Sequence, residues 1–108
     1  MTLYQILSDP DNGLNMPVAY SHFKKDDEDA PESPPYLVYL GAGQTTMDAD
    51  NTHYYRQNQY QIEYYFIDKS EETETAIEDL LLENGFLYEK SEDVYIEDED
   101  VFVIYYTV

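Results

Sequence analysis

Residues 54–67, YYRQNQYQIEYYFI, constrain the fold more than any other part of the chain. From Tyr60 onward, aromatic and β-branched residues alternate with polar ones, so that in an extended backbone they point to opposite sides. Such side chains suit the half-buried surface of a sheet, and neither Pro nor Gly interrupts this stretch. The pattern predicts one long β-strand around which the rest of the chain is organised.

Charge is the strongest anomaly of the composition. The chain of 108 residues contains 24 Asp and Glu against five Lys and Arg, a formal net charge of −19. So few cations cannot neutralise a phosphate backbone, which argues against direct binding of nucleic acid. The length predicts a single domain with one two-layer core.

Other compositional features narrow the class of protein. Cysteine is absent, which excludes disulfides and thiolate metal sites. No apolar run approaches the ~20 residues that cross a bilayer, and the N-terminus lacks the basic start of a signal peptide, so we expect a soluble, unexported protein without membrane contact. The 13 tyrosines and the lack of Trp predict many half-buried rings, in a core or at an interface.

The first 23 residues predict a short helix and a first strand. Residues 2–8 are amphipathic, with Thr2 as N-cap and Leu3, Ile6 and Leu7 on one face. Residues 9–13, DPDNG, superficially resemble a calcium loop. Leu14 and Tyr20 occupy the positions where such a loop needs Gly and Glu, so the pattern favours a turn. Residues 17–23, PVAYSHF, then predict a strand.

The middle of the chain predicts two loops around a strand. Residues 24–35 are acidic and contain three of the five prolines, which is typical of a long, mobile loop. Residues 36–41, YLVYLG, are apolar on both faces and predict a well-covered strand. Residues 42–51 are interpreted as a second loop that leads back to the long strand, with Asp48 and Asp50 in a solvated turn.

After residue 67 the hydrophobic period changes from two to 3.6, which predicts a helix over residues 71–84. Ser70 is its N-cap, acidic residues fill the first turn, and Asn84-Gly85 ends it. The face expected to be buried consists of Thr73, Ile77, Leu80 and Leu81. Leu82 lies roughly opposite, and either a fraying last turn or a contact with another subunit explains it.

Residues 86–95 and 101–108 predict a closing hairpin with an acidic connection over residues 96–100. The last strand, VFVIYYTV, is apolar on both faces, as a central strand is. The expected fold is therefore α+β: a single antiparallel sheet of about four to five strands, with the main helix and the short N-terminal helix packed on one face. Two helices cannot cover both faces of such a sheet, which leaves sheet surface for a partner.

The sequence lacks the patterns of residues that usually carry out enzymatic catalysis. The two histidines, His22 and His53, lie in or beside predicted strands, where a structural role is favoured, and no serine has a nucleophile-elbow or triad-like context. Gly41-Ala42-Gly43 is followed by neither a helix nor a lysine, unlike a phosphate-binding loop. We expect no catalytic residues, no cofactor and no metal, and hence a protein that is not an enzyme.

The order of these stretches resembles a known family. The order is PVAYSHF, an acidic loop, PPYLVYLGAG, DADNTHYYRQNQYQIEYYF and ENGFLYEKSEDVYIEDEDVFVIYYTV, and the resemblance covers about residues 18–108. The chain is similar to small tail-component proteins of long-tailed phages and prophages of Gram-positive bacteria, the tail-terminator and head-to-tail joining proteins. Residues 24–35 depart from that pattern by being longer and more acidic than in the family.

The resemblance implies a structural protein of the virion tail or neck, present in the host cytoplasm during assembly. It implies a ring, expected to be a hexamer, that caps the tail tube, stops tube growth and offers a surface to the head connector. Its partners are then the tube protein, the neck proteins and further copies of itself, with DNA only as passing cargo. Because −19 per subunit opposes ring closure, isolated chains can be monomeric until a tube end acts as template.

Two sets of residues are candidates for contacts in such a ring. The candidates for a subunit or partner interface are Tyr54, Tyr55, Tyr65 and Leu82. The candidates for an acidic lumen, or for exposed loops that only confer solubility, are Asp26, Asp27, Glu28, Asp29, Glu97, Asp98, Glu99 and Asp100. The alternative function is an acidic DNA mimic that inhibits a host nuclease or restriction enzyme; a mimic can act as a monomer or dimer, whereas a ring needs cyclic symmetry.

Overall fold

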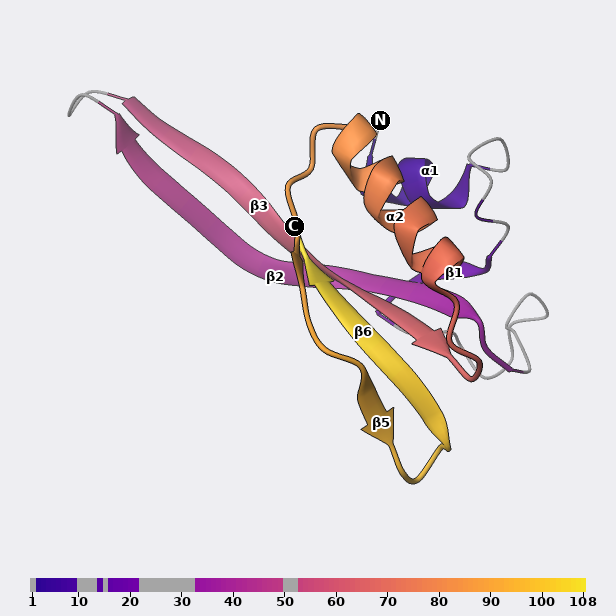
Figure 1. Cartoon of the computed structure of the whole chain (residues 1–108). Helices are drawn as coiled ribbons and strands as arrows, with labels where there is room; N and C mark the ends of the chain where they lie inside the picture. The colour runs from indigo at the N-terminus through magenta and orange to yellow at the C-terminus, as the bar shows by residue number, and fades with distance from the viewer. Residues whose placement is uncertain (1, 10–13, 15, 22–32, 50–52) are drawn as a thin grey trace.

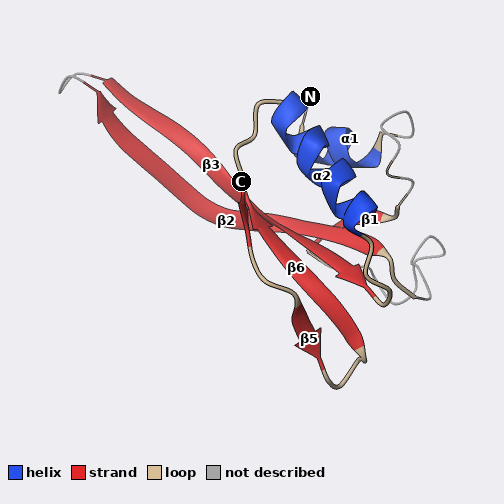
Figure 2. Ribbon diagram, in the orientation of Figure 1, coloured by secondary structure: helices blue, strands red, loops and turns tan. Residues whose placement is uncertain are grey.

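The computed structural model of the chain describes residues 2–9, 14, 16–21, 33–49 and 53–108. Two helices pack on one face of a sheet, and the predicted α+β class is confirmed (Figure 1; Figure 2). The elements are α1 (Leu3–Ser8), β1 (Val18–Tyr20), β2 (Tyr36–Ala49), β3 (His53–Phe66), α2 (Glu71–Glu83), β4 (Glu89–Lys90), β5 (Val94–Ile96) and β6 (Val101–Thr107).

The sheet has six strands and is mixed, which corrects the prediction of four to five antiparallel strands. Its order is β1-β2-β3-β6-β4, and β5 also pairs with β6. β1 runs parallel to β2, whereas all other pairs are antiparallel. The connection over residues 21–35 explains the difference, because a link of that length allows the chain to return and run in the same direction.

β1 is shorter than the strand predicted over residues 17–23. It ends at Tyr20, and Ser21 has a φ of 66°, a left-handed conformation that takes the backbone out of the strand. His22 and the loop predicted over residues 24–35 lie largely outside the described residues, including Asp26, Asp27, Glu28 and Asp29.

β2 is longer than predicted, and the loop expected over residues 42–51 is wrong for residues 42–49. The strand continues through an irregularity between Gly41 and Gln44, where Gly43 has a φ of 103°. Two residues there face one on β3, which is a β-bulge. A glycine within a strand often marks such a bulge, and Gly43 thus lies at a bend in a strand that continues, not in the predicted loop.

β6 is confirmed as a central strand, with β3 on one side and β4 and β5 on the other. The prediction of a single strand over residues 86–95 is wrong, because the structure has two separate strands there, β4 and β5. Ser91 causes the interruption: its hydroxyl accepts a hydrogen bond from the Tyr105 amide at 2.9 Å, while its own amide donates to the Tyr105 carbonyl at 2.8 Å. The Ser91 hydroxyl thus takes the place of a backbone carbonyl as the acceptor for the Tyr105 amide.

The helices form as their sequence signals predict. Thr2 and Gln5 make a reciprocal capping box at α1, which buries Leu3, Ile6 and Leu7. Ser70 caps α2, and Gly85, with a φ of 84°, follows its last turn. Neither described helix is long and apolar enough to cross a membrane.

α2 buries Ile77 and Leu81 completely, whereas Leu80 is only half-buried. Leu82 is 50% exposed on the last helical turn. The core between helices and sheet consists of Leu3, Leu7, Leu14, Leu37, Ile62, Tyr64, Phe66, Ile77, Leu81, Ile104, Tyr106 and Val108.

Candidate interaction surface

A two-stranded ribbon extends from the body of the protein. We call it the hairpin arm and define it as residues 44–49 of β2 and 53–58 of β3, which pair from Gln44 with Asn58 to Ala49 with His53. Figure 1 shows it projecting away from both helices, and the molecule measures 50 × 30 × 30 Å. Among the described strands, none pairs with the outer edge of either arm strand.

The neighbouring strands end at the root of the arm. On one side the last rung joins Tyr60 and Val108, which exchange two backbone hydrogen bonds at 3.0 and 2.9 Å. On the other side the Ser21 amide donates to the Tyr39 carbonyl at 2.7 Å, just after β1. The sheet therefore narrows from several strands to two at this point.

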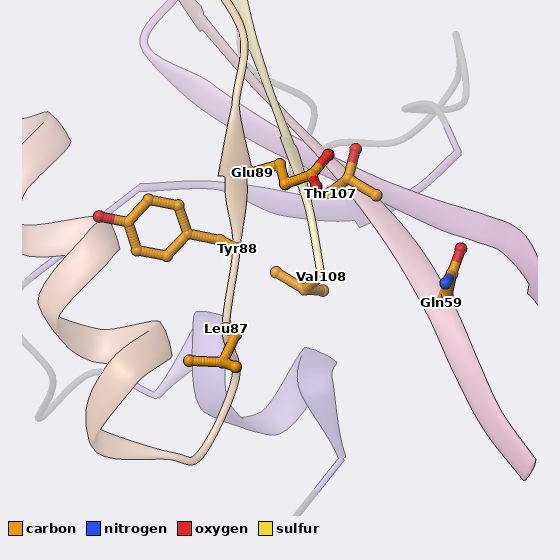
Figure 3. Close-up of a pocket in the computed structure, with 6 residues that line it drawn as sticks. All are labelled: Gln59, Leu87, Tyr88, Glu89, Thr107 and Val108. Atoms are coloured by element: carbon orange, nitrogen blue, oxygen red, sulfur yellow. The ribbon is translucent and has the colours of Figure 1, made fainter. Parts of the chain in front are cut away.

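An open notch lies beside the arm root, where β6 ends (Figure 3). It is lined by Gln59, Leu87, Tyr88, Glu89, Thr107 and Val108. Leu87 is 84% exposed, while the Tyr88 ring points away and its hydroxyl donates to Glu78 Oε1 at 3.1 Å. The lining mixes polar and apolar side chains and contains one acidic side chain, Glu89, which suits contact with another chain better than catalysis.

A second surface is the tyrosine face, defined as Tyr36, Tyr65 and Tyr105 with Glu63. Strand alternation and pairing place it on the side of the sheet opposite the helices. The Tyr36 and Tyr65 rings stack at 5.0 Å, and the Tyr65 hydroxyl donates to Glu63 Oε1 at 2.5 Å. Burial is the main cause of the raised pKa of Tyr65, and the hydrogen bond to the Glu63 carboxylate raises that pKa further. The hydroxyl therefore stays protonated and acts as a donor at neutral pH.

The acidic turn, defined as Glu97, Asp98, Glu99 and Asp100, connects β5 to β6 and is exposed. Asp100 has a left-handed φ of 54° and accepts a hydrogen bond from the Tyr95 hydroxyl at 2.6 Å. The charge of this turn also affects the tyrosine face. Burial is the main cause of the raised pKa of Tyr36, and the negative charge of Glu99 is the second cause.

An ion-pair network on α2 uses both lysines whose side chains are described. Glu74 is only 3% exposed, with Lys69 Nζ 2.8 Å from Oε2 and Lys90 Nζ 2.9 Å from Oε1. Lys69 also pairs with Asp93, and Lys90 with Glu78. Burial alone would raise the pKa of Glu74, but the two lysines outweigh it and hold that pKa below its ordinary value.

Charge is unevenly distributed along the chain. Residues 67–108 carry 14 Asp and Glu with two Lys, and both lysines belong to the network on α2. Residues 36–66, which include the arm, carry three acidic residues and Arg56. The long hairpin is therefore nearly neutral, while the closing part of the chain is strongly acidic.

The predicted interface residues fall on separate surfaces. Tyr54 and Tyr55 lie on β3 within the arm, Tyr65 belongs to the tyrosine face, and Leu82 is exposed on α2. Among the described residues no three His, Asp or Glu side chains are grouped so as to hold a metal ion. The sequence predicted the β3 half of the arm, within the strand over residues 54–67, but not the β2 half or the notch; the glycines of the bulge were the available signal for the β2 half.

Comparisons of the chain with protein-family models, with curated proteins and with solved structures found no match.

Proposed function

We propose that this protein is a structural assembly protein of a phage tail, a tail terminator or head-to-tail joining protein that forms a ring at the end of the tail tube. The resemblance of its sequence to that family supports the proposal. The observation that carries it is the hairpin arm, whose two strands have outer edges that no other described strand covers.

The arm needs a partner for energetic reasons. A two-stranded ribbon without a third strand or a helix is marginally stable in water. An exposed strand edge also invites pairing with another chain. In an assembly, a strand of another chain can pair with the arm and stabilise it, so the arm suits a protein that functions as part of an assembly.

The tyrosine face adds a second contact surface. Half-buried tyrosines are typical of interfaces, because the ring supplies contact area while the hydroxyl keeps a polar partner, as Tyr65 does with Glu63. In a tail ring, this face and the notch are the proposed contacts with neck proteins and the tail tube. The ring then stops tube growth and lets DNA pass as cargo.

The acidic turn fits a lumen in this proposal. Acidic walls repel DNA over the Debye length of about 8 Å at physiological salt, which keeps the duplex centred and mobile. Glu97, Asp98, Glu99 and Asp100 are exposed, as a lumen lining requires.

The acidity of residues 67–108 also favours a second candidate function, a DNA mimic that occupies the basic cleft of a nuclease. The two functions differ in stoichiometry and in phenotype. A mimic protects DNA from its target enzyme as a monomer or dimer, and the virions of a phage without it keep normal tails.

Negative-stain microscopy of lysates from a phage in which this gene is deleted tests the proposal. We expect tails of uncontrolled length or heads without joined tails. Restoring the full-length gene in trans should restore normal particles, whereas a gene lacking residues 44–58 should not. Normal virions from the deletion would contradict the proposed function.

A further inference from the structure

The free edges of the hairpin arm carry defined backbone groups. On β3, Tyr60 directs both its amide and its carbonyl to Val108 on the β6 side. Backbone groups of a strand alternate sides with a period of two. Tyr54, Arg56 and Asn58 therefore direct their amides and carbonyls to the same side, beyond the last residue of β6.

The opposite edge, on β2, follows from the pairing register. Residues 53, 55 and 57 of β3 point toward β2, so their partners Ala49, Met47 and Thr45 form the hydrogen-bonded pairs of the arm. The intervening residues Gln44, Thr46 and Asp48 then direct their backbone groups outward. Each edge of the arm thus presents three residues with outward amides and carbonyls.

These two edges are complementary between copies. When two arms lie side by side and point the same way, β3 of one arm runs antiparallel to β2 of the next. We propose that neighbouring copies of this protein pair their arms edge to edge, Tyr54, Arg56 and Asn58 of one copy with Gln44, Thr46 and Asp48 of the next, in one continuous antiparallel belt.

The partner is a second copy because the two edges belong to one hairpin. Their lengths match by construction, so every copy offers one β2 edge and one β3 edge of equal length, each with both amide donors and carbonyl acceptors. Such a contact is heterologous, and heterologous contacts form a ring when the rotation from one copy to the next closes on itself. The inference rests on the proposed function, which requires copies to associate head to tail.

Charge supports this choice of contact. Residues 44–58 carry Asp48, Asp50 and Arg56, a net charge of −1 in a chain of −19. Because the arm projects from the body, pairing through it brings nearly neutral segments together. The paired segments themselves therefore add little like-charge repulsion between copies.

Proline substitutions at outward amides test the pairing. Thr46→Pro removes a donor from the β2 edge, and Asn58→Pro removes one from the β3 edge, while both leave the hydrogen bonds within the arm in place. Thr46→Val and Asn58→Val are the matched controls, because they keep the amide. Sedimentation velocity is measured in about 1 M NaCl, where the Debye length falls to about 3 Å and bodies repel little.

The wild type and both Val variants should sediment as one closed oligomer, and each Pro variant alone as a monomer. An equimolar mixture of the two Pro variants should give heterodimers, since each supplies the edge that the other lacks. Three results would overturn the inference: assembly of either Pro variant to the wild-type size, dimers of either Pro variant alone, or a monomeric wild type.

Crosslinking keeps the inference testable if a Pro variant does not fold. The chain has no cysteine, so Thr46→Cys copies can be mixed with tagged copies that carry Tyr54→Cys, Arg56→Cys or Asn58→Cys. Oxidation should join a Thr46→Cys copy to a tagged copy by a disulfide at least ten times more often than it joins two identical copies. We expect this for at least one of the three β3 positions. Equal yields at all three positions would contradict edge pairing. Normal tails from the deleted phage alongside mixed crosslinks would instead refute only the proposed function.

Discussion

The body and the hairpin arm of this protein are held together in different ways. In the body, α1 and α2 bury side chains such as Leu7 and Leu81 against the sheet, and an ion-pair network joins α2 to β4. The arm relies on the ladder between its two strands. Stability therefore resides in the body, while the arm is a segment that another chain can complete.

The largest expected effect lies in the body, at Leu81. Leu81→Ala removes a side chain with no exposed surface and leaves a cavity, so it should lower the free energy of unfolding by about 2–5 kcal/mol. Urea denaturation followed by circular dichroism measures this change. Leu82→Ala, at a half-exposed neighbour, is the control and should change the free energy by less than about 0.5 kcal/mol. Similar losses for both variants would mean that the helix is oriented differently.

The ion-pair network should contribute less. Glu74→Gln keeps the shape of the side chain and removes its charge, and we expect a loss of about 1–3 kcal/mol at pH 7. Because the pKa of Glu74 is lowered in the folded state, its contribution is present above the ordinary carboxyl pKa of about 4.3 and is lost as the pH falls through the folded pKa. Unfolding curves from pH 7 to pH 2 should therefore converge for the two proteins; a constant difference would argue against the pairing.

Gly43 tests the junction between body and arm. Its φ of 103° is unfavourable for a residue with a Cβ, although nothing lies within 4 Å of that position. Gly43→Ala should cost about 1 kcal/mol through backbone strain alone. Gly41→Ala is the control, because its Cβ would meet only the Tyr20 hydroxyl at 3.8 Å. If thermal unfolding shows equal stability for both variants, the bulge does not require the left-handed conformation.

The smallest effect on stability should come from the acidic turn. Replacing Glu97, Asp98 and Glu99 by Lys leaves Asp100 to accept the Tyr95 hydrogen bond, so the melting temperature should change little. If the turn lines a lumen, particles should look normal yet release DNA more slowly, most evidently at low salt. Ejection kinetics equal to those of the parent phage would remove this turn from the channel.

Local patterns in the sequence predicted much of the body. The period of 3.6, the Ser70 cap and the stop at Gly85 defined α2, and the apolar residues of β6 indicated a central strand. These signals are local, so one sequence suffices to interpret them. The parallel pairing of β1 was not predictable, because it depends on where a long connection returns.

The β2 strand of the arm was not predicted because polar residues dominate it, whereas its β3 strand lies within the strand predicted over residues 54–67. Gln44, Thr45 and Thr46 lack the alternation that marks a half-buried strand, since no helix covers this part of the sheet. Gly43 suggested a strand end, although it bends a strand that continues. Glu74 was expected only to favour the helix dipole, and its burial between two lysines depends on distant segments.

Hydrogen exchange measures directly whether the outward amides of the arm are open in the isolated chain and become paired on assembly. In the isolated chain, the Leu81 amide in α2 should exchange slowly and the outward amides of Tyr54, Arg56 and Asn58 quickly. On assembly, these three amides should become at least tenfold slower, while the Leu81 amide changes little. Outward amides that are already protected in the isolated chain, or that stay unprotected in the assembled protein, would contradict pairing of the arm edges between copies.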